Sequence, residues 1–398
     1  MGIAAIAAAI ATWALPWYVQ RRSVEIAAEH GIALSVERAE IDRDGFRLVG
    51  IRASWNSVPG IHARAPEIRV ETRALHPEKM TVQGAELTLD GTFAAITSQL
   101  TRWWASPSGG QAGAWAPSAL VVDGAKIAWP SSFGDTVGVE ASNVHAEVSW
   151  GEHGAELHSR ADRVTVALPE AAFGPWRVDV DRAPGSSRVR VALDPEVPEA
   201  CTILVVGDGE RTTSVDIAIP RSPLGHLGVP ERLVGGGSTT LQVETTLHYV
   251  SFGAARVDAT VRGGVYGLGA AGLPVPLDVA WEGAASGDPT RGIDIKRSRL
   301  AVGPLVGPLT GTVKTFDDGF RVDLGWAAGP VPCAAFVQPL GAGQPFDIGY
   351  QLRELARKSG VVDGNIRATM TLSFDSRNVA ATKVSFNPEV RCRSPIFQ

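Results

Sequence analysis

Cysteine is scarce in this chain of 398 residues, which contains only Cys201, Cys333 and Cys392. None of the three belongs to a CxxC pair and no histidine pair lies nearby, so the sequence predicts no zinc site. Two alternatives stay open for the thiols. One is a disulfide between Cys333 and Cys392 in an oxidising compartment, with Cys201 left over, and the other is three buried free thiols. Sequence separation alone does not show whether two Cβ atoms meet.

The chain also lacks any cluster of basic residues. Its 37 lysines and arginines are spread thinly, and its formal net charge is −5. Because a surface that follows a phosphate backbone needs a basic patch, we expect no nucleic-acid partner.

Catalytic and cofactor motifs are missing as well. The chain contains neither a GxSxG elbow nor an HExxH pair. Residues 267–272 match GxGxxG, but Pro274 and Pro276 follow where a dinucleotide site requires a helix. We therefore predict no cofactor and no catalytic residue, and we expect that the protein is not an enzyme.

Histidines are too scattered to suggest a metal site. Only His145, His153 and His158 form a local group, and they straddle a predicted hairpin turn at 151–154. Metal ligands must face one another, so we interpret these histidines as exposed turn residues and predict no bound metal.

A long uncharged run opens the chain. Residues 2–19 read GIAAIAAAIATWALPWYV, and roughly eighteen apolar residues come close to the length that crosses a bilayer. No basic segment precedes the run and no convincing cleavage site ends it, which disfavours a cleaved signal peptide. We predict a retained single-pass anchor over residues 1–20, with membrane contacts from Ile3, Ile6, Ile10, Trp13, Leu15, Trp17 and Tyr18.

The charges that follow this run conflict with an exported location for the rest of the chain. Arg21 and Arg22 follow it directly, and the positive-inside rule would place the remainder in the cytoplasm. That rule is weakest for long translocated domains, and the composition beyond residue 30 is typical of an exported protein. We therefore expect the bulk of the chain outside the inner membrane.

Glycine and proline are abundant, with 44 and 26 residues, and favour many short strands and turns. Residues 32–52 alternate apolar and polar around a turn at 42–45, which indicates a hairpin. The pattern V-x-G-A-x-hydrophobic occurs at 82–87 and again at 122–127, which indicates an irregular repeat. We predict a mainly β protein with an elongated, twisted antiparallel sheet.

Short helices are expected at 23–30, 93–104 and 348–359. The second has an apolar side, and two interpretations stay open for it. It could lie on a membrane surface, or it could close one end of the sheet, which we favour because a membrane-binding helix usually carries several cations. The apolar residues concerned are Phe93, Ile96, Leu100, Trp103 and Trp104.

Domain boundaries are expected near residues 20 and 195. The predicted parts are an anchor over 1–20, an N-terminal β domain over 21–195 and a C-terminal β-repeat domain over 196–398.

The order of elements in residues 1–170 resembles the AsmA/TamB-like family of bacterial envelope proteins. The resemblance rests on the anchor, the brief helix, the segment ALSVERAEIDRDGFRLVGIR with PEIRVETRAL, and then VQGAELTLDG. It implies a sheet folded along its length into a groove, anchored in the inner membrane and projecting into the periplasm. It also implies a part in envelope or outer-membrane biogenesis and in phospholipid binding or transport. The chain is shorter than the largest members, so it would not bridge the periplasm alone.

Other readings remain beside this one. An apolar sheet face could hold acyl chains or could be an ordinary packed core. The chain could also be an accessory subunit of a secretion system, or of peptidoglycan synthesis, because Cys333 and Cys392 lie in segments that loosely resemble the β-rich region preceding a transglycosylase domain. In either case other envelope proteins would be its partners.

Overall fold

The computed structural model describes residues 14–393 apart from 74–75, 106–116, 135, 152–153, 195, 198, 209–211, 231–238, 251–254, 269–276, 290, 317–318, 337–362 and 379–380. Within that part of the chain there are twenty strands, two α-helices and a short 3-10 helix, so the mainly β prediction is confirmed. The chain divides into two units, Met1–Val191 and Ala192–Gln398. The predicted boundary near residue 195 lies close to this division.

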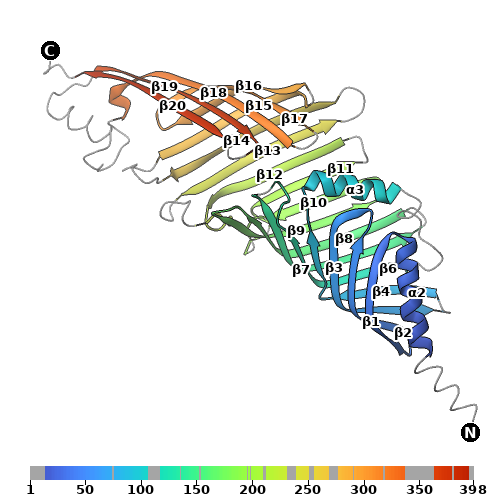
Figure 1. Ribbon diagram of the computed structural model, residues 1–398. Helices are drawn as coiled ribbons and strands as arrows, with labels where there is room; N and C mark the ends of the chain where they lie inside the picture. The colour runs from blue at the N-terminus through green and yellow to red at the C-terminus, as the bar shows by residue number, and fades with distance from the viewer. Residues whose placement is uncertain are drawn as a thin grey trace, which may run out of the picture. The chain divides into compact units, whose positions relative to one another are not determined.

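Unit 1 contains both α-helices and the strands up to β10 (Figure 1). Its elements are α2 (Leu15–Glu29), β1 (Ile32–Asp42), β2 (Gly45–Trp55), β3 (Val58–Arg73), β4 (His76–Gln83), β5 (Glu86–Leu89), α3 (Phe93–Ala105), β6 (Ala119–Trp129), β7 (Gly138–Gly151), β8 (Gly154–Ala167), β9 (Ala172–Ala183) and β10 (Ser186–Ala192). Neighbouring strands pair antiparallel except at β6, which runs parallel to β4 and β5 after the crossover through α3.

That crossover explains the sequence repeat. The two V-x-G-A segments lie side by side in register, with Val82 opposite Val122 and Leu87 opposite Ile127. Gly84 and Gly124 have φ values of +60° and +65°, a conformation that glycine adopts without strain. The first copy is therefore divided at Gly84 into β4 and β5, whereas the second is the continuous strand β6, whose pairing with β7 shifts at Gly124.

Unit 2 is a simple antiparallel meander, in which each strand from β11 to β20 pairs with the next one along the chain (Figure 1). Its elements are β11 (Thr202–Asp208), β12 (Thr212–Pro223), β13 (Thr240–Val250), β14 (Arg256–Leu268), β15 (Leu277–Asp288), β16 (Gly292–Val302), β17 (Leu305–Phe316), β18 (Gly319–Pro332), η2 (Cys333–Phe336), β19 (Asp363–Asp375) and β20 (Lys383–Arg393).

Local turn chemistry explains where the hairpins fall. Asp42 pairs with Gly45 across the first turn, as the sequence predicts. Gly151 pairs with Gly154, so the predicted turn at 151–154 is also confirmed, and Phe316 pairs with Gly319 between β17 and β18. The GxGxxG match begins at the end of β14, and β14 pairs with the following strand, β15, in an antiparallel hairpin.

The helix α2 corrects the prediction for the start of the chain. The sequence separated an anchor ending near residue 20 from a helix over 23–30, but a single helix runs from Leu15 to Glu29 beside β1 (Figure 1). Val19 and Val24 both pack against the sheet, which holds the two predicted segments together as one element. No helix in the described part of the chain is both long and apolar enough to cross a membrane.

Several predicted features lie outside the described residues. They are the membrane-contact residues Ile3, Ile6, Ile10 and Trp13 and the predicted helix over 348–359.

Candidate functional site

Unit 2 has one apolar and one polar sheet face, because side chains alternate along each strand. On β13 and β14, Val243 lies opposite Gly263 and Leu247 opposite Ala259. On the other face, Thr246 pairs with Thr260, and their hydroxyl oxygens lie 2.6 Å apart. We call the first side the unit 2 apolar face.

This face continues without a break from β11 to β20. The pairing registers place apolar residues of successive strands opposite one another through the whole meander. The bulges in the sheet do not interrupt this order. Among the members of the face are Ile203, Val205, Val215, Ile217, Val243, Leu247, Val261, Val279, Trp281, Leu300, Leu309, Val322, Leu324, Trp326, Leu372, Met370, Val384 and Phe386.

Most of this face is only partly buried. Val215, Leu247, Val261, Val322 and Leu372 all keep intermediate exposure. Among the described elements of unit 2, the main contacts are between neighbouring strands and between η2 and the strands beside it. The exposure follows from this arrangement, since a second layer of structure would bury such side chains. Within the described residues, and apart from one buried cluster at its margin, the unit 2 apolar face is therefore a single-layer surface rather than a packed core.

At one margin of the face, the side chains form a compact hydrophobic cluster. Trp326 is buried among Leu300, Ile366 and their neighbours, and its indole Nε1 donates a hydrogen bond to the Leu300 carbonyl oxygen at 2.9 Å. Cys333 is fully buried in the same cluster. This margin is the part of unit 2 that is packed like an ordinary core.

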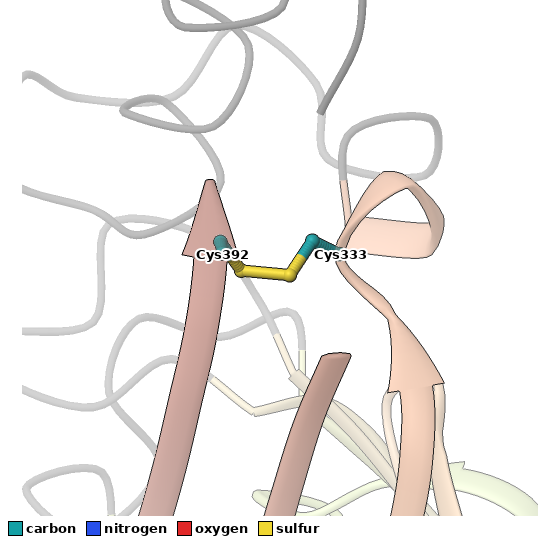
Figure 2. The surroundings of a disulfide bond; sticks show 2 residues. All are labelled: Cys333 and Cys392. Atoms are coloured by element: carbon teal, nitrogen blue, oxygen red, sulfur yellow. A yellow bond between two sulfur atoms is a disulfide. The ribbon is translucent and has the colours of Figure 1, made fainter. Parts of the chain in front are cut away.

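A disulfide ties the last strand to that cluster. Cys333 and Cys392 are bonded, with Cα atoms 5.9 Å apart, so of the two alternatives left open by the sequence the structure has the disulfide. Figure 2 shows the bond joining the end of β20 to the chain that leaves β18. Cys201 is a buried free thiol.

In unit 1, helices cover part of the apolar face. The helix α2 lies over β1 and β2 through Val19 and Val24. The helix α3 lies over β3, β5 and β6, where Ile96 is only 2% exposed. The side-chain amide of Gln20 also donates to the Val36 carbonyl oxygen at 2.6 Å, which attaches α2 to the edge strand β1.

The packing of α3 agrees with the favoured of its two interpretations, a helix that closes the sheet. Ile96, Leu100 and Trp103 face the sheet, and the Trp103 indole donates to the His30 carbonyl oxygen at 3.1 Å. In this structure these side chains are therefore part of the protein's own core. Phe93 is exposed and stacks on Trp129, while nothing is described for the side chain of Trp104.

Three predicted membrane-contact residues are described at the start of α2. Leu15, Trp17 and Tyr18 are all exposed, Trp17 at 59% and Tyr18 at 54%. The Arg21 guanidinium lies 5.5 Å from the centre of the Trp17 ring. Large aromatic side chains beside a cation are typical of a membrane interface.

The polar faces of both units carry repeated ion pairs between residues two apart on one strand. Arg256 pairs with Asp258 and Arg321 with Asp323, at 2.7 and 2.9 Å. These contacts lower the pKa of both aspartates: the Arg256 hydrogen bond does so at Asp258, and hydrogen bonds from Ser373 and Arg321 do so at Asp323. Such exposed pairs contribute little stability, but they keep this side of the sheet hydrated.

The prediction for the histidines is right about their exposure but wrong about their placement in a turn, and His153 lies outside the described residues. His145 and His158 lie within β7 and β8 rather than in the turn, and their Nδ1 atoms are 2.6 Å from Asp123 and 2.9 Å from Asp181. The hydrogen bond with Asp181 raises the pKa of His158. They line a polar hollow of about 430 Å³, and the described residues contain no group able to hold a metal ion.

Comparisons with protein-family models, with curated proteins and with solved structures found no match.

Proposed function

We propose that this chain is a non-enzymatic, AsmA-like protein of the bacterial envelope that holds phospholipid acyl chains against the unit 2 apolar face. The observation that carries the proposal is the continuous apolar surface of ten strands, most of which stays partly exposed among the described residues outside the Trp326 cluster. A partly exposed apolar surface of this kind suits an apolar occupant, because contiguous apolar patches on a protein surface often mark binding sites.

Acyl chains suit this surface physically. Burying a methylene contributes about 0.8 kcal/mol, and the interaction has no preferred direction, so neither a catalytic group nor a specific polar contact is needed. The opposite face, with ion pairs such as Arg256–Asp258, stays in water. We propose that the sheet of unit 2 is curved so that its apolar face lines a groove.

Two observations support a periplasmic location with an inner-membrane tether. Disulfides such as Cys333–Cys392 form and persist in oxidising compartments. The exposed side chains of Trp17 and Tyr18 at the start of α2 follow closely on the apolar run of residues 2–13. Tryptophan and tyrosine are enriched where a membrane segment meets water. On this proposal the protein takes part in envelope biogenesis through phospholipid binding or transport.

Site-specific photocrosslinking in cells tests the proposal. Benzoylphenylalanine replaces Leu247 on the apolar face or Thr246, its neighbour on the polar face, in the full-length chain. We expect radiolabelled phospholipid to be captured at Leu247 and not at Thr246. A second matched pair is Val261 and Thr260 of β14. Equal capture on both faces, or none on either, contradicts the proposal.

The alternative function is an accessory subunit of a secretion system or of peptidoglycan synthesis, with the sheet as a protein-binding surface. The observation that favours it is the exposed strand β20, where Val384 and Phe386 face water. The same photocrosslinking experiment separates the two functions. Capture of a stoichiometric protein partner at Leu247, in place of lipid, would favour the accessory subunit.

A further inference from the structure

The first strand of unit 1, β1, and the last strand of unit 2, β20, differ in what contacts their backbone. At β1, the side-chain amide of Gln20 on α2 donates to the carbonyl oxygens of Val36 and Glu37. Among the described residues, β20 pairs with β19 alone. Unpaired edges attract further strands, and proteins usually cover or disrupt them.

Strand β20 carries the unit 2 apolar face to its edge. Val384 lies opposite Leu372 and Phe386 opposite Met370, on the apolar side of the sheet. Val384, Phe386 and Val390 are 65%, 50% and 45% exposed. Whatever lies beside β20 must therefore continue an apolar surface on this side.

The polar side of β20 is cationic. It presents Lys383, Arg391 and Arg393 and a single carboxylate, Glu389, which pairs with Arg391. The disulfide at Cys392 holds this end of the strand in place. The edge is thus ordered, amphipathic and positively charged.

We propose that β20 is a docking edge for an extended segment of a partner protein, with apolar residues on one face and acidic residues on the other. The added strand would take its backbone hydrogen bonds from β20, extend the apolar face and place carboxylates opposite Lys383, Arg391 and Arg393. This is strand addition, in which the backbone supplies affinity and alternate side chains supply specificity.

Charge argues against a second copy of this chain as the occupant. In an antiparallel pair of two β20 strands that overlap fully, Lys383 of each copy lies opposite Arg393 of the other. Like charges directly opposite are destabilising. An acidic strand removes this repulsion.

Model peptides test the proposal on the full-length chain held in amphipol. The probes are a seven-residue peptide of alternating valine and glutamate and the same peptide with lysine, with binding followed by fluorescence anisotropy. We expect the glutamate peptide to bind more tightly, by about fivefold or more, from its cross-strand charge pairs. Alternate backbone N–H groups of the peptide would point toward β20. Two peptides, each N-methylated at one of the two alternate sets of backbone nitrogens, are therefore compared. One of the two should fail to bind, because it has lost the N–H groups that donate to β20.

Charge reversal supplies the matched control. The variant Arg391→Glu with Arg393→Glu should invert the peptide preference, whereas Arg262→Glu on the interior strand β14 should leave it unchanged. Equal binding of both peptides, indifference to methylation, or an unchanged preference in the double variant overturns the proposal. If the full chain forms a dimer and the substitution Phe386→Lys dissociates it, the occupant of the β20 edge is a second copy and the proposal is wrong. Lipid capture at Leu247 is measured separately, so either proposal can fail without the other.

Discussion

Leu247 and Thr246 are neighbours in β13, yet one faces a half-buried apolar surface and the other faces water. The alternation of single residues decides this, because side chains on a strand point to opposite sides in turn. A shift of one residue in pairing would exchange the two faces. The position of each residue along its strand therefore determines whether its side chain lies on the apolar or the polar face of unit 2.

Asp375, at the end of β19, provides a test at this scale. Its carboxylate accepts hydrogen bonds from the Arg377 side chain at 2.7 and 2.9 Å and from the Arg377 backbone N–H at 3.0 Å. These bonds lower its pKa from 3.8 to about 2. A carboxyl group whose pKa is lower in the folded state stabilises the fold above its unfolded pKa and loses that effect as the pH falls through its folded pKa.

We therefore expect Asp375→Asn to be less stable than the natural protein at pH 7, and the difference to vanish as the pH falls from about 4 to about 2. Chemical denaturation at a series of pH values measures it. Asp294→Asn is the control, since this exposed aspartate makes a longer contact of 3.5 Å with Lys296. A difference that persists at pH 2 would show that the Asp375 carboxylate charge is not the cause.

At the scale of elements, the two helices of unit 1 have the same role. Both α2 and α3 lie on the apolar side of the sheet, and the Trp103–His30 hydrogen bond joins them. A truncation at residue 22 would therefore cut α2 in half and remove Val19 from the core, whereas a truncation before Leu15 would leave this helix whole.

For α3 we expect Ile96→Ala to lower the free energy of unfolding by about 2–4 kcal/mol, because it opens a cavity under the helix. Thr101→Ala on the outer side should change it little, since that exposed hydroxyl bonds only to the Thr97 carbonyl oxygen of its own helix. Denaturant unfolding measures both. An Ile96→Ala variant with unchanged stability but weaker vesicle binding would instead support the interfacial interpretation.

At the scale of the whole molecule, a lipid bound to the folded state should stabilise it. A ligand at about 100 times its Kd adds about 2.7 kcal/mol. We expect short-chain phosphatidylcholine, kept below its micelle concentration, to raise the unfolding midpoint of the full chain in amphipol. Leu247→Lys should reduce the rise and Thr246→Lys should not. An equal rise in both variants would mean that lipid binds elsewhere.

Much of this architecture was predictable because it depends on local signals. The turn at Asp42–Gly45 and the β class follow from alternation and turn residues within a few positions. The fusion of the predicted anchor end with the first helix was missed, since it depends on Val19 meeting a sheet formed later in the chain. The strand positions of His145 and His158 were missed because both residues were assigned to the turn that they flank, although strand pairing continues on either side up to Gly151 and Gly154.

The candidate site was harder to predict for a different reason. Period-two patterns reveal an apolar side for each strand, but they do not reveal whether anything covers it. Trp281 and Val261 have the same apolar character as core residues, and only the arrangement of the described elements leaves them partly exposed. The parallel pairing of the two V-x-G-A segments likewise depends on the crossover through α3.

The meander of unit 2 joins each strand only to its neighbours in sequence. Structures with nearest-neighbour contacts behave as one-dimensional arrays, whose stability is a sum of units and interfaces. A hairpin could thus be inserted or removed from the middle, such as β13 with β14, without changing the register of the strands on either side. Evolution could adjust the length of such a protein in steps of two strands, about 10 Å each.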